Sequence, residues 1–342
     1  MHIPRYWAQA RLRHDTGLRH GATVQRWGWS DDSPADADAH ARSRAQAALD
    51  ALLAAPQQRN LSTSFRRIEH LGDYGLNGET PIREEILEQR GTAVITRNSY
   101  GAHCLNTPNV AFADIDTEPE HPKGRRTFPF FSLAFTVVPL LLALLQPKAL
   151  SLQYLPSWIW IVGCAMLFVR NLRLWQADRA SSASAQDPNK AALERVAAFS
   201  QQNPSWGLRL YKTPKGLRVL VTHQTLLPTS PAVQQLFSAL QVDPLYARLC
   251  AQQQCFRARL TAKPWRIGIA GSSPQVRRWP VAQAHQDQRT AWSQHYDRTA
   301  ADYSACHFVA QLGETNIDTT VQAVLDWHDS ASHAHDTQRK LA

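Results

Sequence analysis

The stretch NVAFADIDTEPE, residues 109–120, predicts a buried strand that ends in two carboxylates. The apolar residues from Val110 to Ile115 are typical of a strand interior, and Asp114 and Asp116 stand two positions apart at its end. Because alternate residues of a strand lie on one face of a sheet, we expect both carboxylates on the same face. The stretch is therefore either part of a metal site or the polar rim where a strand enters a loop.

A D-x-D pattern offers hard oxygen ligands to Mg²⁺ or Mn²⁺, ions that keep other positions for water and phosphate oxygens. Asp114 and Asp116 are accordingly the candidate metal ligands. The pattern is short, and a solvated acidic turn fits the same residues. Both interpretations stay open at the level of the sequence.

The chain has 342 residues, enough for one large or two ordinary domains, and 44% of them are hydrophobic. Its formal net charge of +9 favours contact with phosphate groups, either of nucleic acid or of anionic lipid. The five cysteines are odd in number and scattered, and the N-terminus has no apolar leader. Reduced thiols in the cytosol are the simplest expectation.

Two apolar runs follow the strand. The first, FPFFSLAFTVVPLLLALL at 128–145, has no charge over a length that suits a bilayer core, and the second covers 153–170. Basic residues flank the pair on the outside, and Lys148 is the one cation between the runs. The positive-inside rule then predicts a two-span protein of the inner (cytoplasmic) membrane, with both termini cytoplasmic and the lipid bilayer as partner. The alternative is a buried helical hairpin.

A double crossing leaves residues 1–124 and 174–342 on the same side, where we expect them to pack together. Strand and helix patterns alternate in both segments and predict an α+β fold with a mainly antiparallel sheet, interrupted by the transmembrane helical hairpin. The segment 207–223, GLRLYKTPKGLRVLVTH, predicts a β-hairpin. The segments 81–90 and 304–313 are expected to be helical. Neither a Walker A loop nor a GxGxxG motif occurs.

The segment CFRARLTAKPWR, 255–266, concentrates positive charge. Arg257 and Arg259 share one face of a predicted strand, and Lys263 follows with Trp265 beside it. Such a group suits phosphates and a stacked base or ring. A basic surface that meets anionic lipid headgroups fits equally well.

Other polar residues carry weaker signals. His328 and Asp329 in LDWHDS are either part of a metal site or the surface of a helix, and the helix surface is the simpler interpretation. No G-x-S-x-G elbow supports a serine hydrolase.

The order of a D-x-D strand and a later hairpin that ends in His223 resembles the archaeo-eukaryotic primase-polymerase superfamily. That resemblance implies a sheet like that of an RNA-recognition motif, metal binding by Asp114 and Asp116, and a nucleotide contact by His223. The chain also resembles uncharacterised bacterial two-span membrane proteins with segments like IPRYWA and ITRNSYG, which implies no activity.

The sequence thus predicts a membrane-anchored domain for metal-dependent nucleotide, phosphoryl or nucleotidyl transfer. The alternative is a non-catalytic, membrane-tethered binding or scaffold protein whose basic patch meets lipid, nucleic acid or a partner protein. In the first case a divalent ion lies between the carboxylates and the cations. The expected site consists of Asp114 and Asp116 for Mg²⁺ or Mn²⁺, with Arg257, Arg259, Lys263 and His223 for phosphate or nucleotide.

Overall fold

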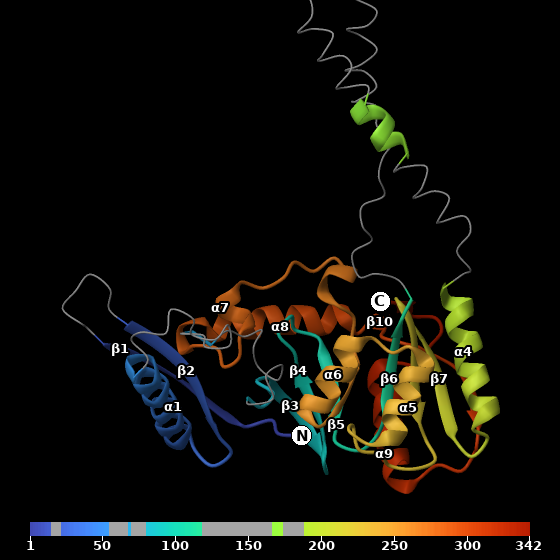
Figure 1. Cartoon of the computed structure of the whole chain (residues 1–342), viewed down its shortest axis with the longest axis horizontal. Helices are drawn as coiled ribbons and strands as arrows, with labels where there is room; N and C mark the ends of the chain where they lie inside the picture. The colour runs from blue at the N-terminus through green and yellow to red at the C-terminus, as the bar shows by residue number, and fades with distance from the viewer. Residues whose placement is uncertain (15–21, 55–67, 70–79, 118–165, 174–187) are drawn as a thin grey trace, which may run out of the picture. The chain divides into compact units, whose positions relative to one another are not determined.

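The computed structural model describes residues 1–14, 22–54, 68–69, 80–117, 166–173 and 188–342 (Figure 1). The chain divides into two compact units, of which the first contains 1–116 and 192–342 and the second contains 117–191. The strands described below all belong to the first unit.

An N-terminal hairpin consists of β1 (Tyr6–His14) and β2 (Ala22–Ser30), which pair antiparallel. Helix α1 (Pro34–Ala54) packs against it through small residues four positions apart, among them Ala37 and Ala41, which are fully buried. Gly28 makes this close packing feasible, because a Cβ there would lie 2.1 Å from the backbone nitrogen of Ala41.

A four-stranded antiparallel sheet has the order β3-β4-β5-β9. Its strands are β3 (Glu85–Arg90), β4 (Ala93–Arg97), β5 (His103–Thr107) and β9 (Phe256–Arg259). The helix expected over 81–90 is wrong, since 85–90 pair with β4 across a two-residue connection. Gly91 supplies the positive φ of 56° that this tight connection uses.

A second four-stranded antiparallel sheet has the order β11-β7-β8-β6. Its strands are β11 (His307–Gly313), β7 (Gly207–Thr213), β8 (Gly216–Val221) and β6 (Phe112–Asp116). The predicted hairpin is confirmed as β7 and β8. The helix expected over 304–313 is wrong, because 307–313 form the strand that pairs with the outer edge of β7.

Helices surround these sheets. They are α4 (Pro188–Gln202), α5 (Pro231–Leu240), α6 (Pro244–Gln253), α7 (Pro274–Arg277), α8 (Gln286–Ala300) and α9 (Thr319–Ser332), with the short 3₁₀ turns η3 (Pro264–Arg266) and η4 (Gln283–His285). Two short strands, β10 (Tyr303–Ser304) and β12 (Lys340–Leu341), pair in parallel. The predicted α+β class with mainly antiparallel sheets is confirmed.

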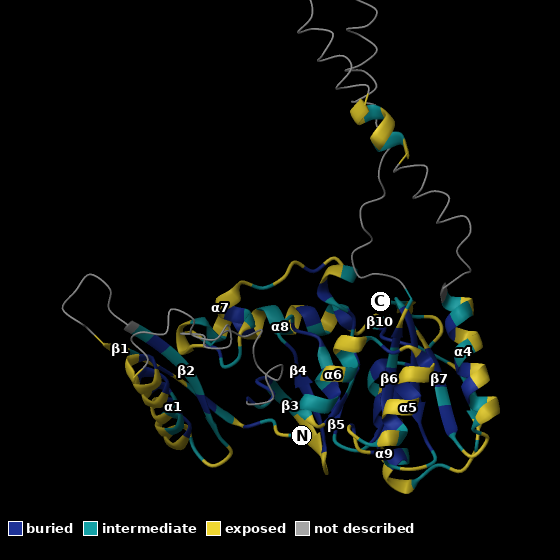
Figure 2. Cartoon of the chain, viewed as in Figure 1, coloured by how far each residue is buried: buried dark blue, intermediate teal, exposed yellow. Residues whose placement is uncertain are grey.

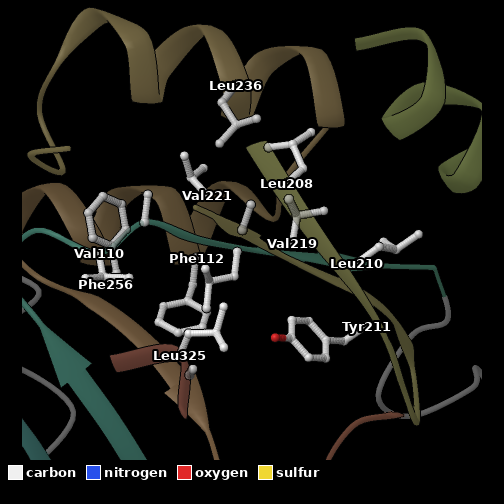
Figure 3. Packing of buried hydrophobic residues seen from close by; sticks show 14 of the residues in the cluster. Val110, Phe112, Leu208, Leu210, Tyr211, Val219, Val221, Leu236, Phe256 and Leu325 are labelled. Carbon is white, nitrogen blue, oxygen red and sulfur yellow. The ribbon is translucent and has the colours of Figure 1, made fainter. Parts of the chain in front are cut away.

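The main core packs on both faces of the sheet β11-β7-β8-β6. Alternate residues of β7 and β8, such as Leu208 and Val221, point to the same side and meet Leu236 of α5 (Figure 3). Figure 2 shows the inner strands buried and the outer faces of α4 and α5 exposed. We call the opposite face the polar face, because Asp114 and Arg218 lie on it beside the apolar Phe112 and Leu220.

Both large sheets combine strands from the two ends of the first unit. Leu105 of β5 pairs with Ala258 of β9, and Ala113 of β6 pairs with Val219 of β8. Residues before 117 and after 191 therefore build one structure together.

The expected transmembrane hairpin requires correction. Within the described ranges, no helix combines the length and the apolar character that a bilayer crossing needs. Of the two predicted spans, 128–145 lies outside the described residues, and only 166–170 of the second lie within them. These belong to a short helix at 166–173 that contains Arg170 and Arg173. The prediction of a multi-pass inner-membrane protein was therefore wrong: the length of a run and its lack of charge do not by themselves establish a spanning helix.

Candidate functional site

The polar face of the sheet β11-β7-β8-β6 carries a row of residues that lie opposite one another. Strand register places Asp114 opposite Arg218, Arg218 opposite Tyr211, and Tyr211 opposite Phe308. Directly opposed residues of neighbouring strands share a face. Helix α9 covers this face, and the ring of its His328 lies 4.9 Å from that of Tyr211. The row is thus enclosed between sheet and helix.

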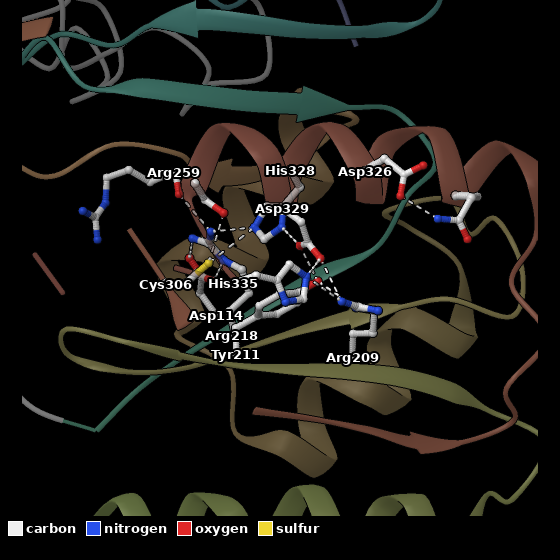
Figure 4. Close-up of polar contacts among 12 residues, drawn as sticks. Asp114, Arg209, Tyr211, Arg218, Arg259, Cys306, Asp326, His328, Asp329 and His335 are labelled. Atoms are coloured by element: carbon white, nitrogen blue, oxygen red, sulfur yellow. Dashed lines mark hydrogen bonds and ion pairs between the residues drawn. The ribbon is translucent and has the colours of Figure 1, made fainter. Parts of the chain in front are cut away.

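Asp114 forms a bidentate ion pair with Arg218. Nε of Arg218 donates to Oδ1 at 2.7 Å and Nη2 donates to Oδ2 at 3.1 Å, while the arginine side chain is only 2% exposed (Figure 4). Burial lowers the pKa of Arg218, but the charge and hydrogen bonds of Asp114 outweigh this, so the net pKa is raised. Nη1 donates to the backbone carbonyl of Arg259 at 2.9 Å. The arginine therefore connects β6 and β8 to β9 of the other sheet.

Asp329 of α9 is the centre of a second group of contacts and is almost completely buried. Its Oδ1 accepts from the Tyr211 hydroxyl at 2.7 Å and lies 2.9 Å from Nδ1 of His328. Its Oδ2 receives Nη2 of Arg209 at 2.8 Å and Nε2 of His335 at 3.0 Å. Burial alone would raise the pKa of Asp329, but the hydrogen bonds from His328 and Tyr211 and the charges around it lower it. The group therefore stays a carboxylate.

His328 and Cys306 lie deeper, between the two groups. Nη1 of Arg218 approaches Nε2 of His328 at 3.3 Å, and because arginine only donates, this nitrogen accepts and Nδ1 donates to Asp329. The Cys306 sulfur lies 3.9 Å from the same Nε2 and 3.4 Å from the Ser332 hydroxyl. Cys306 and His328 are fully buried, whereas nucleophilic cysteines are partly exposed. We therefore assign them a structural role.

A hollow of about 570 Å³ opens beside Asp329, a volume in the range of small-molecule sites. Arg209 stands at its wall with its guanidinium 4.3 Å from the ring centroid of Phe308. The His335 side chain is 58% exposed, and its ring also contacts Phe308. The lining residues are Arg209, Gln322, Leu325, Asp326, Asp329, Ser330, His333, His335 and Asp336.

The predicted metal ligands fit a divalent ion poorly. Both carboxylate oxygens of Asp114 are bonded to Arg218, and Asp116 lies exposed at the end of β6, opposite Gly216. A metal at Asp114 would have to displace a buried guanidinium. Among the residues that the structure describes, no three His, Cys, Asp or Glu side chains are grouped as a metal site would require. Binding of Mg²⁺ or Mn²⁺ stays a prediction.

The predicted phosphate ligands are distributed over separate places. Arg257 pairs with the buried Glu84 at 2.5 Å, and Arg259 donates to the carbonyl of Thr261 at 3.3 Å. The expected group of Asp114 with Arg257 and Arg259 is thus replaced by two ion pairs, Asp114–Arg218 and Glu84–Arg257.

His223 and Lys263 also occupy different surroundings. Nδ1 of His223 accepts from the backbone nitrogen of Gly207 at 3.2 Å, and partial burial lowers the pKa of His223. This bond ties the end of the hairpin to its start. The Lys263 amino group lies over the rings of Tyr100 and Trp265.

In the sequence, Arg209 and Arg218 stand within the predicted hairpin 207–223, and Asp329 was considered only together with His328. The sequence analysis did not connect these residues, and it missed His335. One available signal was Arg218 itself, a charged residue in the otherwise apolar strand GLRVLV. Such a residue requires a partner carboxylate, because an unpaired buried charge is costly.

We found no match to this chain among protein-family models, curated proteins or solved structures. The likeness to the primase-polymerase superfamily therefore remains a prediction from short motifs.

Proposed function

We propose that the protein is an acid–base enzyme that acts on a small anionic ester in the hollow beside α9. The observation that carries the proposal is the contact of 3.0 Å between Nε2 of His335 and Oδ2 of Asp329 at that hollow. In this site His335 moves the proton, Asp329 orients its ring, and Arg209 holds the negative group of the substrate.

The assignment of His335 follows from its partner. Nε2 of His335 lies 3.0 Å from Oδ2 of Asp329 and 3.3 Å from Nη2 of Arg209. Because Nη2 already donates to Asp329 at 2.8 Å, we assign the proton to Nε2, which donates to the nearer carboxylate and leaves Nδ1 to accept a proton. A ring held in this way is a suitable general base, because the carboxylate orients it and its Nδ1 is left to accept a proton. The ring is more than half exposed, which leaves it accessible to water and substrate.

Arg209 supplies the complementary charge. Its Nε donates to the Tyr211 hydroxyl at 3.1 Å and its Nη2 to Asp329, while no described residue accepts from its Nη1. The guanidinium is thus fixed in place with donor capacity left for an oxygen of a phosphate or carboxylate.

Two other carboxylates line the hollow and limit the negative charge that a ligand can carry there. The charge of Asp336 is balanced by an ion pair with Arg339 at 2.8 Å. Asp326 has no such balance among the described residues, since it accepts a hydrogen bond from the neutral Gln322. This balance favours a single negative group beside Arg209 over a polyanion. At such a site Nδ1 of His335 takes a proton from water, and the water oxygen bonds to the phosphorus or carbonyl carbon of the ester. The bond from that atom to the ester oxygen breaks, and the protonated His335 gives its proton to the leaving alcohol.

Metal-dependent nucleotidyl transfer, the function expected from the sequence, has weaker support. It requires a divalent ion at Asp114, whose two oxygens are bonded to Arg218. We therefore assign no step to a metal.

The test is hydrolysis of chromogenic phosphate monoesters, phosphate diesters and carboxylate esters by the full chain in the presence of EDTA. His335→Gln should reduce the rate by about 10²–10⁴-fold, the range for loss of general acid–base catalysis. Arg209→Gln should raise KM, and His295→Gln, at an exposed histidine of α8, is the matched control.

A binding measurement accompanies the assay. Inorganic phosphate should shift the NMR signals of the His335 ring in the wild type but not in Arg209→Gln. Equal rates for wild type and His335→Gln, or the absence of both hydrolysis and phosphate binding, would show that the proposal is wrong.

A further inference from the structure

A second surface, separate from the hollow, combines aromatic rings with positive charge. It consists of Tyr100, Lys263 and Trp265, which we call the Trp265 surface. The indole of Trp265 is 49% exposed, an unusual exposure for so large an apolar ring. The Lys263 amino group lies 5.4 Å from the centroid of Trp265 and 5.9 Å from that of Tyr100. Both are within the range of a cation–π contact.

The backbone holds this surface in a defined shape. Trp265 is the middle residue of η3, which Pro264 begins and which the bond from Arg266 N to the Lys263 carbonyl, 2.9 Å, closes. The rings of Tyr100 and Trp265 lie 5.3 Å apart at 62°, an edge-to-face arrangement. The backbone nitrogen of Tyr100 donates to the Asn98 side chain at 3.2 Å. The indole is therefore presented by a fixed turn.

The chain segment that contains Lys263 and Trp265 is rich in positive charge, and one of its arginines, Arg257, is paired with Glu84. Between residues 244 and 286 the chain has no Asp or Glu and seven cations: Arg248, Arg257, Arg259, Lys263, Arg266, Arg277 and Arg278. Two of these arginines also act on Tyr100. Burial raises the pKa of Tyr100 to about 12, while the charges of Arg259 and Arg257 act to lower it. Arg248 and Arg278 are exposed.

We propose that the Trp265 surface binds single-stranded nucleic acid, with one base stacked on the indole of Trp265 and backbone phosphates neutralised by Lys263 and by exposed cations of the same chain segment. Stacking platforms in a positive groove are the usual means of binding single strands without sequence readout. A duplex offers no free base face to an exposed ring. An exposed tryptophan also suits a lipid interface, so vesicles are a comparison probe in the test.

The experiment is fluorescence anisotropy of a labelled single-stranded oligonucleotide titrated with the full chain at several salt concentrations. The same sequence as a duplex, and vesicles of phosphatidylglycerol, are the comparison probes. Trp265→Ala should weaken binding of the single strand by about 10-fold, from the loss of one stacked base. Lys263→Ala should reduce the slope of log affinity against log salt by about one.

Matched controls distinguish binding at the Trp265 surface from a general effect of losing a positive charge or an exposed apolar side chain. Leu227→Ala removes another exposed apolar side chain, 61% exposed, and Lys212→Ala removes another exposed lysine. Both should bind the single strand as the wild type does, and circular dichroism should show all four variants folded.

Three results would overturn the proposal. These are equal affinity of wild type and Trp265→Ala, equal affinity for single strand and duplex, and binding to anionic vesicles without binding to the single strand. Absence of binding to every probe overturns it as well.

Discussion

Replacement of Asp114 by Asn distinguishes the structural role of this residue from a metal-binding one. The substitution keeps the size of the side chain and removes its charge, which leaves the guanidinium of Arg218 without a carboxylate. The arginine is only 2% exposed, so water replaces the lost partner incompletely. We therefore expect Asp114→Asn to destabilise the protein strongly, whether or not a metal is present.

The magnitude follows from the geometry of the pair. Loss of one partner of a buried ion pair costs about 3–5 kcal/mol. Asp114 is 30% exposed and Asn still accepts one hydrogen bond, so the lower end, about 3 kcal/mol, applies here. The double variant Asp114→Leu, Arg218→Met removes both charges and should recover most of this loss, because well-packed apolar residues often replace a buried pair without cost.

The assay is urea unfolding followed by tryptophan fluorescence, with and without Mg²⁺. At a dependence of about 3 kcal/mol per molar urea, Asp114→Asn should lower the midpoint by about 1 M. Mg²⁺ should leave the wild-type midpoint unchanged. The thermodynamic cycle over the single variants Asp114→Leu and Arg218→Met and their double variant isolates the pair energy.

The opposite pattern would refute the reasoning. A midpoint for Asp114→Asn equal to that of the wild type, together with a wild type that Mg²⁺ stabilises and a variant that it does not, would mean that Asp114 holds a metal and that the Arg218 pair contributes little.

Two further predictions concern the packing of α1 and the pH dependence of stability. Gly28→Ala should lower the free energy of unfolding by about 1–3 kcal/mol, because the new Cβ would clash with the backbone of Ala41. Thermal unfolding measures this loss. Gly271→Ala is the control and should be unaffected, since a Cβ there meets nothing within 4 Å. Partial burial lowers the pKa of His223 below 6.5, and its neutral ring accepts from Gly207. The folded state then binds fewer protons than the unfolded state, so this contribution is present above pH 6.5 and is lost as the pH falls through the lower folded pKa. His223→Gln should therefore destabilise more at about pH 7.5 than at about pH 5, measured by urea unfolding, and an equal loss at both pH values would contradict it.

Local patterns account for the parts of the fold that were predicted correctly. The strand around 110–116 and the hairpin over 207–223 show apolar residues and turn residues within a few positions of one another, so neighbours in the chain suffice to specify them. The segments 85–90 and 307–313 were predicted wrongly because their state depends on partner strands. Residues 307–313 form the strand β11 because they pair with the edge of β7. The sequence pattern of 307–313 alone does not indicate that partner.

The predicted site was incomplete for the same reason. The sequence analysis placed Asp114 in a metal site together with Arg257 and Arg259, the cations of the most basic segment. In the structure, the strand register of β6 and β8 places Arg218, which is 104 positions away in the chain, opposite Asp114.

By itself, the sequence determined the α+β class, the antiparallel hairpin and the surplus of positive charge between residues 244 and 286, because each depends on composition or on residues close in the chain. The tertiary structure decided which charges meet. Asp114 pairs with Arg218, and Asp329 gathers Arg209 and His335 at the hollow, because strand register and the packing of α9 bring together side chains that are far apart in the chain.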